Sequence, residues 1–380
     1  MTITSGHLAT ARRIHDTLPV VDGHNDLPWE IRIRAASSLA TADPRRHLDG
    51  FHTDFPRLRA GGVGVQFWSV YVPTWSRSPR DETHQQIDLV AAMTAAAPEW
   101  TALAADADSA VAIRDGGRLA GLMGIEGGYS IEEDLGAIAE FHDRGVRYMT
   151  LTHADTISWA DSATDKPRHG GLTEFGREVV RDMNRVGMLV DVSHVSADTM
   201  RHAVETSRAP VIASHSCAYA IAPHPRNIPD DVIAAIAAGG GVVMVTFVPA
   251  FVVATTAHQA LDMFEEGRRL RARFAPDDEA GYAAASRELF GSREIDRGTV
   301  ANVVDHIEHI ARVGGVDHVG IGSDFDGTSQ VPVGLEDVSC YPAITEELLR
   351  RSWQESDIRA VLGGNALRAL RVAEEAAGRV

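Results

Sequence analysis

The sequence predicts an α/β fold, a (β/α)₈ or TIM barrel, on the strength of three observations. The chain has 380 residues, 44% of them hydrophobic, which is enough to bury a large core. Short apolar segments rich in Val, Ile, Leu and Met recur along it, as expected of parallel strands that are covered on both faces. Amphipathic stretches of helical length lie between these segments, and this alternation is typical of a barrel.

Eight apolar segments are expected to form the strands. The first of them reads LPVVDGH and the last reads HVGIGSDFDG. In chain order the expected strands are 18–24, 63–72, 119–127, 146–153, 188–194, 210–216, 241–247 and 318–327. A doubly wound open sheet is the alternative arrangement of the same elements.

Helices are expected before, between and within these units. A short helix is predicted at 7–17, and Thr173 and Ser196 open helical stretches as N-caps. The long interval between the last two strands carries two helical patterns, which predict a helical insertion between strands seven and eight at about 250–300. This insertion is either a lid or an oligomer contact. No linker or repeat divides the chain, so residues 1–380 are expected to form a single domain.

Composition excludes several classes of partner. The formal charge of −17 argues against nucleic acid and anionic membrane surfaces, which attract clustered cationic side chains. No apolar run reaches the roughly 18 residues of a membrane span, and the first residues lack the apolar core of a signal peptide. Cys217 and Cys340 are far apart and have no metal-type spacing, which favours a reducing, cytoplasmic location.

Polar side chains gather where the expected strands end, the edge at which barrel active sites lie. His24 and Asp26 are two residues apart and would share one face of a strand. Five other strands finish in His or acidic residues: Glu126, His153, His194, His215, and Asp324 with Asp326. Histidine nitrogens and carboxylates on one rim suit Zn²⁺, with a carboxylate free to bridge a second ion. Two such ions would hold a shared hydroxide and polarise a carbonyl, which is a hydrolytic design.

Each of these residues also has a structural explanation when it is taken alone. A lone histidine at a strand end is more often a hydrogen-bonded structural residue than a ligand. Glu126 could cap the following turn, Asp155 could satisfy His153, and Asp324 could cap a helix. The convergence of so many residues on one rim favours the metal site.

The ordered set of motifs resembles the membrane dipeptidase family, also called renal dipeptidases or peptidase family M19. The matching stretches span roughly residues 18–370 and are VVDGHNDLPW, GIEGG, LTHADTISWADS, LTEFGREVVRDMNRVGMLVDVSHVS, VIASHSCAYAIAPHPRNIPDD, HVGIGSDFDG and GGNALR. The resemblance implies a barrel with two Zn²⁺ per chain that cleaves free dipeptides. It also implies a homodimer, and the chain looks like a soluble bacterial-type member of the family.

The resemblance further implies how the metal ligands are shared. His24 and Asp26 match the ligands of one zinc, and His194 and His215 match those of the other. Glu126 matches the carboxylate that bridges both ions.

Three more residues match family positions that contact the substrate. His153 matches the histidine that steadies the substrate carbonyl and its tetrahedral intermediate. Arg226, in HPRN, matches the arginine that holds the terminal carboxylate, a task suited to a forked donor. Asp324 matches the acid that handles the proton and the substrate amine. Asp326 has the same strand parity, and only the family pattern favours Asp324.

The predicted function is therefore a zinc dipeptidase in which a metal-bridging hydroxide attacks the peptide bond, with L-Xaa-D-Xaa dipeptides among its substrates. The alternative is another binuclear metal amidohydrolase, such as a lactonase or an N-acyl amino acid hydrolase. Many such enzymes bridge their metals with a carboxylated lysine, whereas the single lysine here, Lys166, lies in the loop TDKPRHGG. A catalytically silent barrel and a structural zinc protein are further alternatives, but neither needs the full ligand set together with a spare acid and arginine.

Overall fold

The protein is described here by a computed structural model, which covers residues 3–18, 20–275 and 277–377. Pro19, which falls within the first expected strand, lies outside the described residues. No helix among the described residues is both long and apolar enough to cross a membrane.

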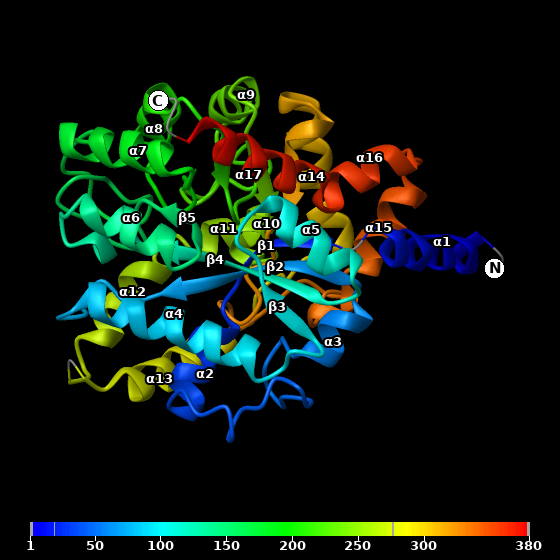
Figure 1. The fold of residues 1–380 in the computed structure, drawn as a ribbon, viewed down its shortest axis with the longest axis horizontal. Coiled ribbons are helices and arrows are strands. Elements are labelled where there is room, and N and C mark those ends of the chain that lie inside the picture. The colour runs from blue at the N-terminus through cyan, green and yellow to red at the C-terminus, as the bar shows by residue number, and fades with distance from the viewer. Residues whose placement is uncertain (1–2, 19, 276, 378–380) are drawn as a thin grey trace.

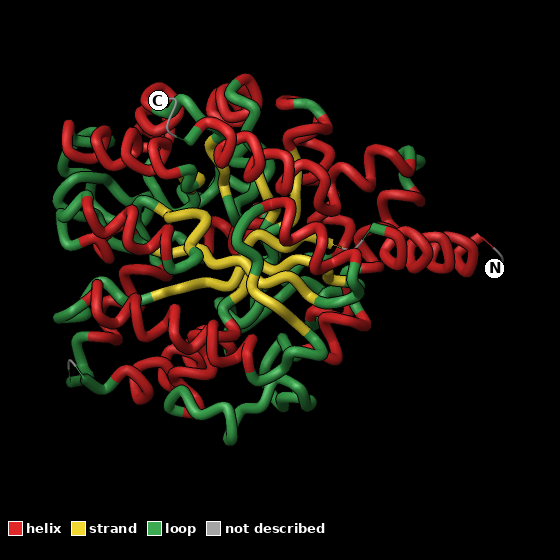
Figure 2. Tube along the Cα trace, viewed as in Figure 1, coloured by secondary structure: helices red, strands yellow, loops and turns green. Residues whose placement is uncertain are grey.

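Eight parallel strands close into a barrel that is wrapped by helices (Figures 1 and 2). They are β1 Val20–Asn25, β2 Val63–Tyr71, β4 Leu119–Glu126, β5 Val146–Thr150, β6 Leu189–Asp191, β7 Val211–Ala213, β8 Val242–Val245 and β9 Val319–Ile321. The ring closes through the pairing of β1 with β9 and of β2 with β4. The predicted barrel is thus confirmed, and the open doubly wound sheet is wrong.

One described strand, β3 (Thr101–Leu103), was not predicted. It pairs with the first residues of β4, Leu119–Gly121, whereas β5 pairs with Met123–Glu126 further along that strand. β3 has only three residues, TAL, and no apolar run marks it. Periodicity therefore gives no signal for it.

Helices surround the barrel and follow its strands. They are α1 Ile3–Thr17, α2 Leu27–Ala35, α3 Phe55–Ala60, α4 Pro79–Ala95, α5 Ala107–Asp115, α6 Gly136–Asp143, α7 Glu174–Val186, α8 Ala197–Thr206, α9 Asp230–Ala238, α14 Val300–Gly314, α15 Pro342–Arg350, α16 Glu355–Arg359 and α17 Asn365–Ala376. Thr173 and Ser196 accept hydrogen bonds from backbone N–H groups three residues on, so both predicted N-caps are confirmed. α1 contains the expected helix 7–17, contacts α15 and projects from one end of the molecule (Figure 1).

The segment between β8 and α14 is helical, as predicted. It contains α10 Pro249–Val252, α11 Ala254–Gln259, α12 Met263–Arg271 and α13 Glu279–Gly291. α12 contacts α13, and no residue of α13 is buried. α13 therefore lies on the surface of the protein and adds nothing to the core.

The barrel interior is filled by apolar side chains from its strands. A buried cluster draws on most of the ring, with Val21, Phe67 and Leu122 among its members, and it also includes Leu367 and Leu370 of α17. Alternate residues of a strand face opposite sides of the sheet, so the other strand residues pack against the outer helices. The interior is a packed core, and polar chemistry is left to the carboxyl ends of the strands.

His306 makes the stability of the fold depend on pH. Its ring is fully buried, with Nδ1 accepting the Ala218 N–H at 3.0 Å and Nε2 donating to the Val252 carbonyl at 2.9 Å. Burial lowers the pKa of His306 from 6.5 to about 4. Below pH 6.5 the unfolded chain therefore binds a proton at His306 that the folded chain does not bind. The contribution of His306 to the free energy of unfolding is complete above pH 6.5 and is lost as the pH falls toward 4.

We expect this residue to account for a loss of about 2 kcal/mol in the free energy of unfolding between about pH 7 and pH 5. Urea unfolding of the wild type and of His306→Gln at both pH values measures it. The variant should be less stable at the higher pH but should lose less stability on acidification. An identical pH dependence in both proteins would contradict the assignment.

Candidate active site

The predicted site residues come together at the carboxyl ends of the barrel strands. Only His24 in β1 and Glu126, the last residue of β4, lie within strands. The others lie in the loops that follow β1, β5, β6, β7 and β9: Asp26, His153, His194, His215 with Arg226, and Asp324. His194 and Asp324 have φ values of 67° and 66°, a left-handed conformation that a strand residue does not adopt. The expected strand ends were therefore too long at these positions, although the edge of the barrel was correct.

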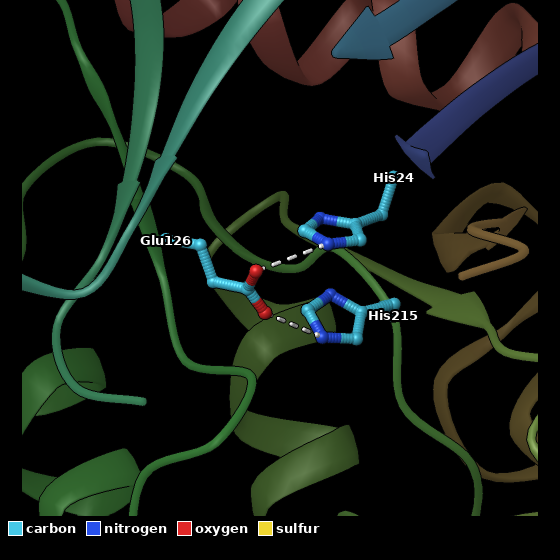
Figure 3. A group of neighbouring side chains, drawn as sticks. All are labelled: His24, Glu126 and His215. Carbon is cyan, nitrogen blue, oxygen red and sulfur yellow. Dashed lines mark ion pairs between the residues drawn. The ribbon is translucent and has the colours of Figure 1, made fainter. Parts of the chain in front are cut away.

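Glu126 lies at the centre of the cluster. Its Oε1 is 3.0 Å from His194 Nε2 and 3.5 Å from His215 Nε2. Its Oε2 is 3.4 Å from His24 Nε2, so the carboxylate lies between His24 and His215 with one oxygen turned to each (Figure 3). His194 Nε2 and His215 Nε2 are 2.9 Å apart. This is the placement that a bridging ligand requires.

A second acidic group lies beside His24. His24 Nε2 is 3.3 Å from Asp26 Oδ2, and Asp324 offers an oxygen within 4.8 Å of both ligand atoms. Asp326 instead accepts the His52 N–H at 2.7 Å, and its own N–H donates to His52 Nδ1 at 3.1 Å. Strand parity does not distinguish Asp324 from Asp326, but the structure does. Asp324 is the one that lies beside His24 and Asp26.

His153 lies on the far side of Glu126 from His24. Its Nε2 is 3.8 Å from Glu126 Oε1, and its ring centroid is 4.3 Å from that of His194. On its other side, its ring centroid is 4.7 Å from that of Tyr71 at the end of β2. His153 is close enough to be a ligand of a cation beside Glu126 or to contact a substrate there.

The donor set fits divalent cations. His24 Nε2 is buried and makes no hydrogen bond to any described residue, although two carboxylates face it. Tyr148 Oη is 2.8 Å from His24 Nδ1 and Ser214 Oγ is 2.8 Å from His215 Nδ1. Partners on Nδ1 leave the Nε2 lone pairs free for a metal ion. Imidazole nitrogens together with carboxylates are the usual ligands of Zn²⁺.

Electrostatics favour the ligand forms of most of these groups. Burial holds the pKa of His194 and of His215 well below the usual range, so both rings are neutral. Burial alone would raise the pKa of Glu126, but its interactions with the surrounding histidines, His24 first among them, outweigh burial and hold that pKa well below its usual range.

Asp324 behaves differently from Glu126. Burial and the neighbouring charge of Asp26 raise the pKa of Asp324 well above its usual range. The pKa values of Glu126 and Asp324 are therefore shifted in opposite directions, a pattern typical of sites that use one acid as a ligand and another to move protons.

Arg226 is a fully buried cation beside this cluster. Its Nη1 donates to Ser216 Oγ and its Nη2 to the His215 carbonyl, both at 3.2 Å, and Phe251 lies under its guanidinium at 5.0 Å. No carboxylate among the described residues lies within ion-pair distance, and Nε has no hydrogen-bond partner there. Burial lowers the pKa of Arg226 to about 10, which still leaves it charged at neutral pH. A buried cation without a counter-ion can receive an anionic ligand.

The helical insertion lies against loops on the same side as the site. Arg268 of α12 is 3.3 Å from Asp155 and donates to the Thr164 carbonyl at 3.0 Å, both in the loop that follows β5. Tyr282 of α13 packs edge-on against Trp75, in the loop that follows β2, with ring centroids 5.3 Å apart. These contacts place the insertion beside the loops on this side of the barrel, and its role as a lid or as an oligomer contact stays a prediction.

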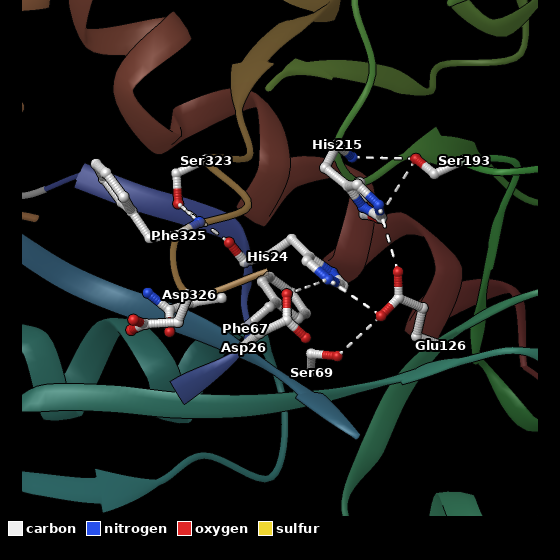
Figure 4. Close-up of polar contacts among 12 residues, drawn as sticks. His24, Asp26, Phe67, Ser69, Glu126, Ser193, His215, Ser323, Phe325 and Asp326 are labelled. Carbon is white, nitrogen blue, oxygen red and sulfur yellow. Dashed lines mark hydrogen bonds and ion pairs between the residues drawn. The ribbon is translucent and has the colours of Figure 1, made fainter. Parts of the chain in front are cut away.

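Three supporting side chains were not predicted. Tyr148 and Ser214 contact the Nδ1 atoms of His24 and His215. Ser69 donates to Glu126 Oε2 at 3.2 Å, as Figure 4 shows. All three are buried polar groups in or next to apolar strands. A polar residue within an apolar run is a signal for such contacts, but the sequence does not show which partner it meets.

The fold is a closed parallel barrel, and histidines and carboxylates surround Glu126 at the ends of its strands. These features define a class of barrel proteins that bind metal ions. Within that class the chain belongs to the membrane dipeptidase family, peptidase family M19, whose sequence model matches residues 8–380.

Curated relatives agree with this family. Dipeptidase 3 of Mus musculus is 38% identical over 365 residues, which are 94% of this chain and 65% of that protein. Dipeptidase 3 of Rattus norvegicus is 37% identical over 364 residues, with the same coverage. The chain thus spans about 65% of the length of these relatives.

Solved structures share the fold. The probable dipeptidase PvdM from Pseudomonas aeruginosa matches with a TM-score of 0.82 at 23% identity, covering 98% of this chain and all of that one. A metallopeptidase from Rhodobacter sphaeroides, solved with a phosphinate mimic of L-Ala-D-Ala, matches with a TM-score of 0.75 at 24% identity, covering 94% of this chain and 99% of the other.

Proposed function

We propose that this protein is a zinc dipeptidase that hydrolyses the peptide bond of free dipeptides, L-Xaa-D-Xaa dipeptides among them. The observation that carries this function is the Glu126 carboxylate, which lies between His24 on one side and His194 with His215 on the other. Membership of the membrane dipeptidase family supports the reaction class.

Five residues would hold two Zn²⁺ ions. His24 and Asp26 would bind one ion, His194 and His215 the other, and Glu126 would bind both. When bound, the ions would acidify a water molecule held between them and polarise the scissile carbonyl.

Two residues beside the ligands would act on the reacting atoms. Asp324 would accept the proton of the attacking water and pass it to the leaving amine, a role that suits its high proton affinity. His153, adjacent to Glu126 and His194, would donate a hydrogen bond to the oxygen that gains negative charge.

A cationic group and an acidic group would bind the two ends of a free dipeptide. Arg226 would bind the terminal carboxylate, since it is buried and carries no counter-ion among the described residues. Asp324 would receive the amine. A longer peptide offers no carboxylate at the distance of Arg226, so the arrangement selects for dipeptides.

Zinc analysis combined with a panel of L,L and L,D dipeptides tests this function, with L-Ala-D-Ala as the first substrate. We expect about two zinc ions per chain, hydrolysis that is lost on chelation, and recovery on addition of Zn²⁺. Zinc binding without dipeptide cleavage would indicate that the substrate is another amide or an ester, such as an N-acyl amino acid or a lactone. A protein that neither binds zinc nor cleaves after reconstitution would refute the function.

Replacing Arg226 with alanine should mainly raise KM for dipeptides with a free carboxylate. Loss of a charged hydrogen bond of roughly 1.5–3 kcal/mol corresponds to about a 10- to 100-fold increase in KM. Zinc content should not change, and dipeptide amides, which lack the carboxylate, should be equally poor substrates of both proteins. An unchanged KM for free dipeptides would remove Arg226 from the site.

A homodimer and a cytoplasmic location stay predictions of the family resemblance and of the composition. Light scattering on the purified protein measures the first, and cell fractionation measures the second.

A further inference from the structure

Two fully buried aspartates lie next to the site but outside its proposed ligand set. Asp22 is in β1 and Asp191 is the last residue of β6, and both follow a buried valine in these strands. A buried carboxylate is costly unless several donors satisfy it. The donors that each one collects are therefore informative.

Asp22 joins β1 to the loop after β9. It accepts the Ser323 N–H and O–H, each at 2.8 Å, and the Tyr341 O–H at 2.7 Å. It also accepts the His24 N–H at 3.3 Å. Ser323 directly precedes Asp324, and its hydroxyl is 3.2 Å from the His24 carbonyl (Figure 4). We call Asp22, Ser323 and Tyr341 the first clamp.

Asp191 joins β6 to the loop after β7 in the same manner. It accepts the Ser214 N–H at 2.8 Å, the Ser214 O–H at 2.6 Å and the Thr150 O–H at 2.5 Å. It also accepts the Ser193 N–H at 3.1 Å. Ser193 directly precedes His194, and Ser214 directly precedes His215. We call Asp191, Thr150 and Ser214 the second clamp.

The two clamps share one design. Each aspartate accepts the N–H of the residue two positions further on, the N–H and O–H of a serine in the loop after a neighbouring strand, and the O–H of a second hydroxyl side chain. Each also supports a residue with positive φ, Asp324 or His194. Such a conformation persists only where its surroundings hold it.

The second clamp also determines which ring nitrogen of His215 carries the proton. Because Ser214 donates its hydroxyl hydrogen to Asp191, its oxygen is left to accept from His215 Nδ1, 2.8 Å away. A hydrogen on Nδ1 leaves the lone pair of His215 on Nε2, which faces Glu126.

We propose that Asp22 and Asp191 are positioning residues, each for one half of the metal centre. Asp22 fixes the positions of His24 and Asp324, whereas Asp191 fixes the positions of His194 and His215. This inference rests on the proposed metal centre, and it predicts that the two halves can be weakened separately.

Zinc binding to the metal-free full chain tests it, through the variants Asp22→Asn and Asp191→Asn. Each substitution keeps the shape but turns one acceptor oxygen into a donor that faces other donors. We expect zinc affinity of one half to fall about 10- to 100-fold in each variant, as measured by competition with a chelating dye. The thermal midpoint of the metal-free proteins, measured alongside, reports any general loss of stability.

Combination with ligand variants identifies the affected half. In a His24→Ala background, which keeps only the His194 half, Asp191→Asn should weaken the remaining zinc while Asp22→Asn should not. In a His194→Ala background the order should reverse. Equal losses in both backgrounds would overturn the inference, because they would indicate general destabilisation.

Milder variants apply if the asparagine variants do not fold. Tyr341→Phe and Thr150→Val remove one hydroxyl from the first and second clamp respectively. Thr101→Val is the matched control, since it removes a buried hydroxyl that donates at 2.9 Å to Leu119, at the opposite end of β4 from Glu126. The clamp variants should weaken zinc binding, whereas the control should change only the thermal midpoint.

The outcomes separate this inference from the proposed function. Zinc affinity unchanged in the clamp variants of an active dipeptidase would overturn the inference alone. A wild type that binds zinc, loses it in the predicted half of each variant and cleaves no dipeptide would overturn the proposed function alone. A wild type that binds no zinc would overturn both.

Discussion

Asp324→Asn is expected to lower kcat by roughly 10²- to 10⁴-fold, the usual contribution of a positioned general base. The amide keeps the shape of the side chain but cannot accept the proton of the attacking water. Steady-state kinetics with L-Ala-D-Ala, together with zinc analysis of the same preparation, measures the effect. Zinc content should stay close to that of the wild type, because Asp324 is not among the five proposed ligands.

Asp326→Asn is the matched control for this substitution. Asp326 has the same strand parity as Asp324 but is bonded to His52 and turned away from His24. It should retain most of the activity. If the Asp326 variant loses more activity than the Asp324 variant, the roles of the two residues are reversed and the resemblance that separated them was misapplied.

The pH dependence of kcat gives a second readout for Asp324. Removal of the group that accepts the proton should abolish the limb of the profile that reports its titration, whereas a merely structural loss would scale the whole profile down. An unchanged profile with reduced kcat would therefore contradict proton transfer by Asp324.

The barrel could be predicted because parallel strands covered on both faces produce apolar runs that are visible in one sequence. The ends of those strands could not be predicted in the same way. The chain that leads to His194 and His215 stays buried beyond the last residue of β6 and of β7, so burial continues where the strand has already ended. β3 escaped prediction for the opposite reason, since it is a strand without an apolar run.

The site was predictable as a set of residues but not as a set of contacts. Barrel closure brings all carboxyl ends of the strands to one rim, so residues at those ends must converge. The choice between Asp324 and Asp326 depends on His52, which is distant in sequence and meets Asp326 only in the folded chain. The clamps depend likewise on tertiary partners such as Tyr341. Their one signal in the sequence is an aspartate two or three residues before a histidine, in DGH and DVSH.

Glu126→Gln should lower zinc content and turnover together. The substitution replaces one of two ligand oxygens by an amide nitrogen that cannot bind a cation, so the two halves of the site lose their shared ligand. The loss of activity should exceed the roughly 10- to 100-fold that follows from removing a residue that merely supports a ligand. Metal analysis after gel filtration and kinetics on the same sample measure both effects.

Glu374→Gln is the matched control for the change from carboxylate to amide. Glu374 is half-buried in α17 and accepts the Ala107 N–H at 3.1 Å, on an element that contributes no residue to the site. It should keep normal zinc content and activity.

A titration of Glu126→Gln with excess Zn²⁺ then separates an effect on zinc affinity from an effect on the reaction itself. Full recovery would mean that Glu126 only raises affinity, whereas a saturated but slow enzyme would mean that it also sets the geometry of the ions. Full activity of Glu126→Gln without added zinc would refute the bridge, because no other described carboxylate lies between His24 and His194.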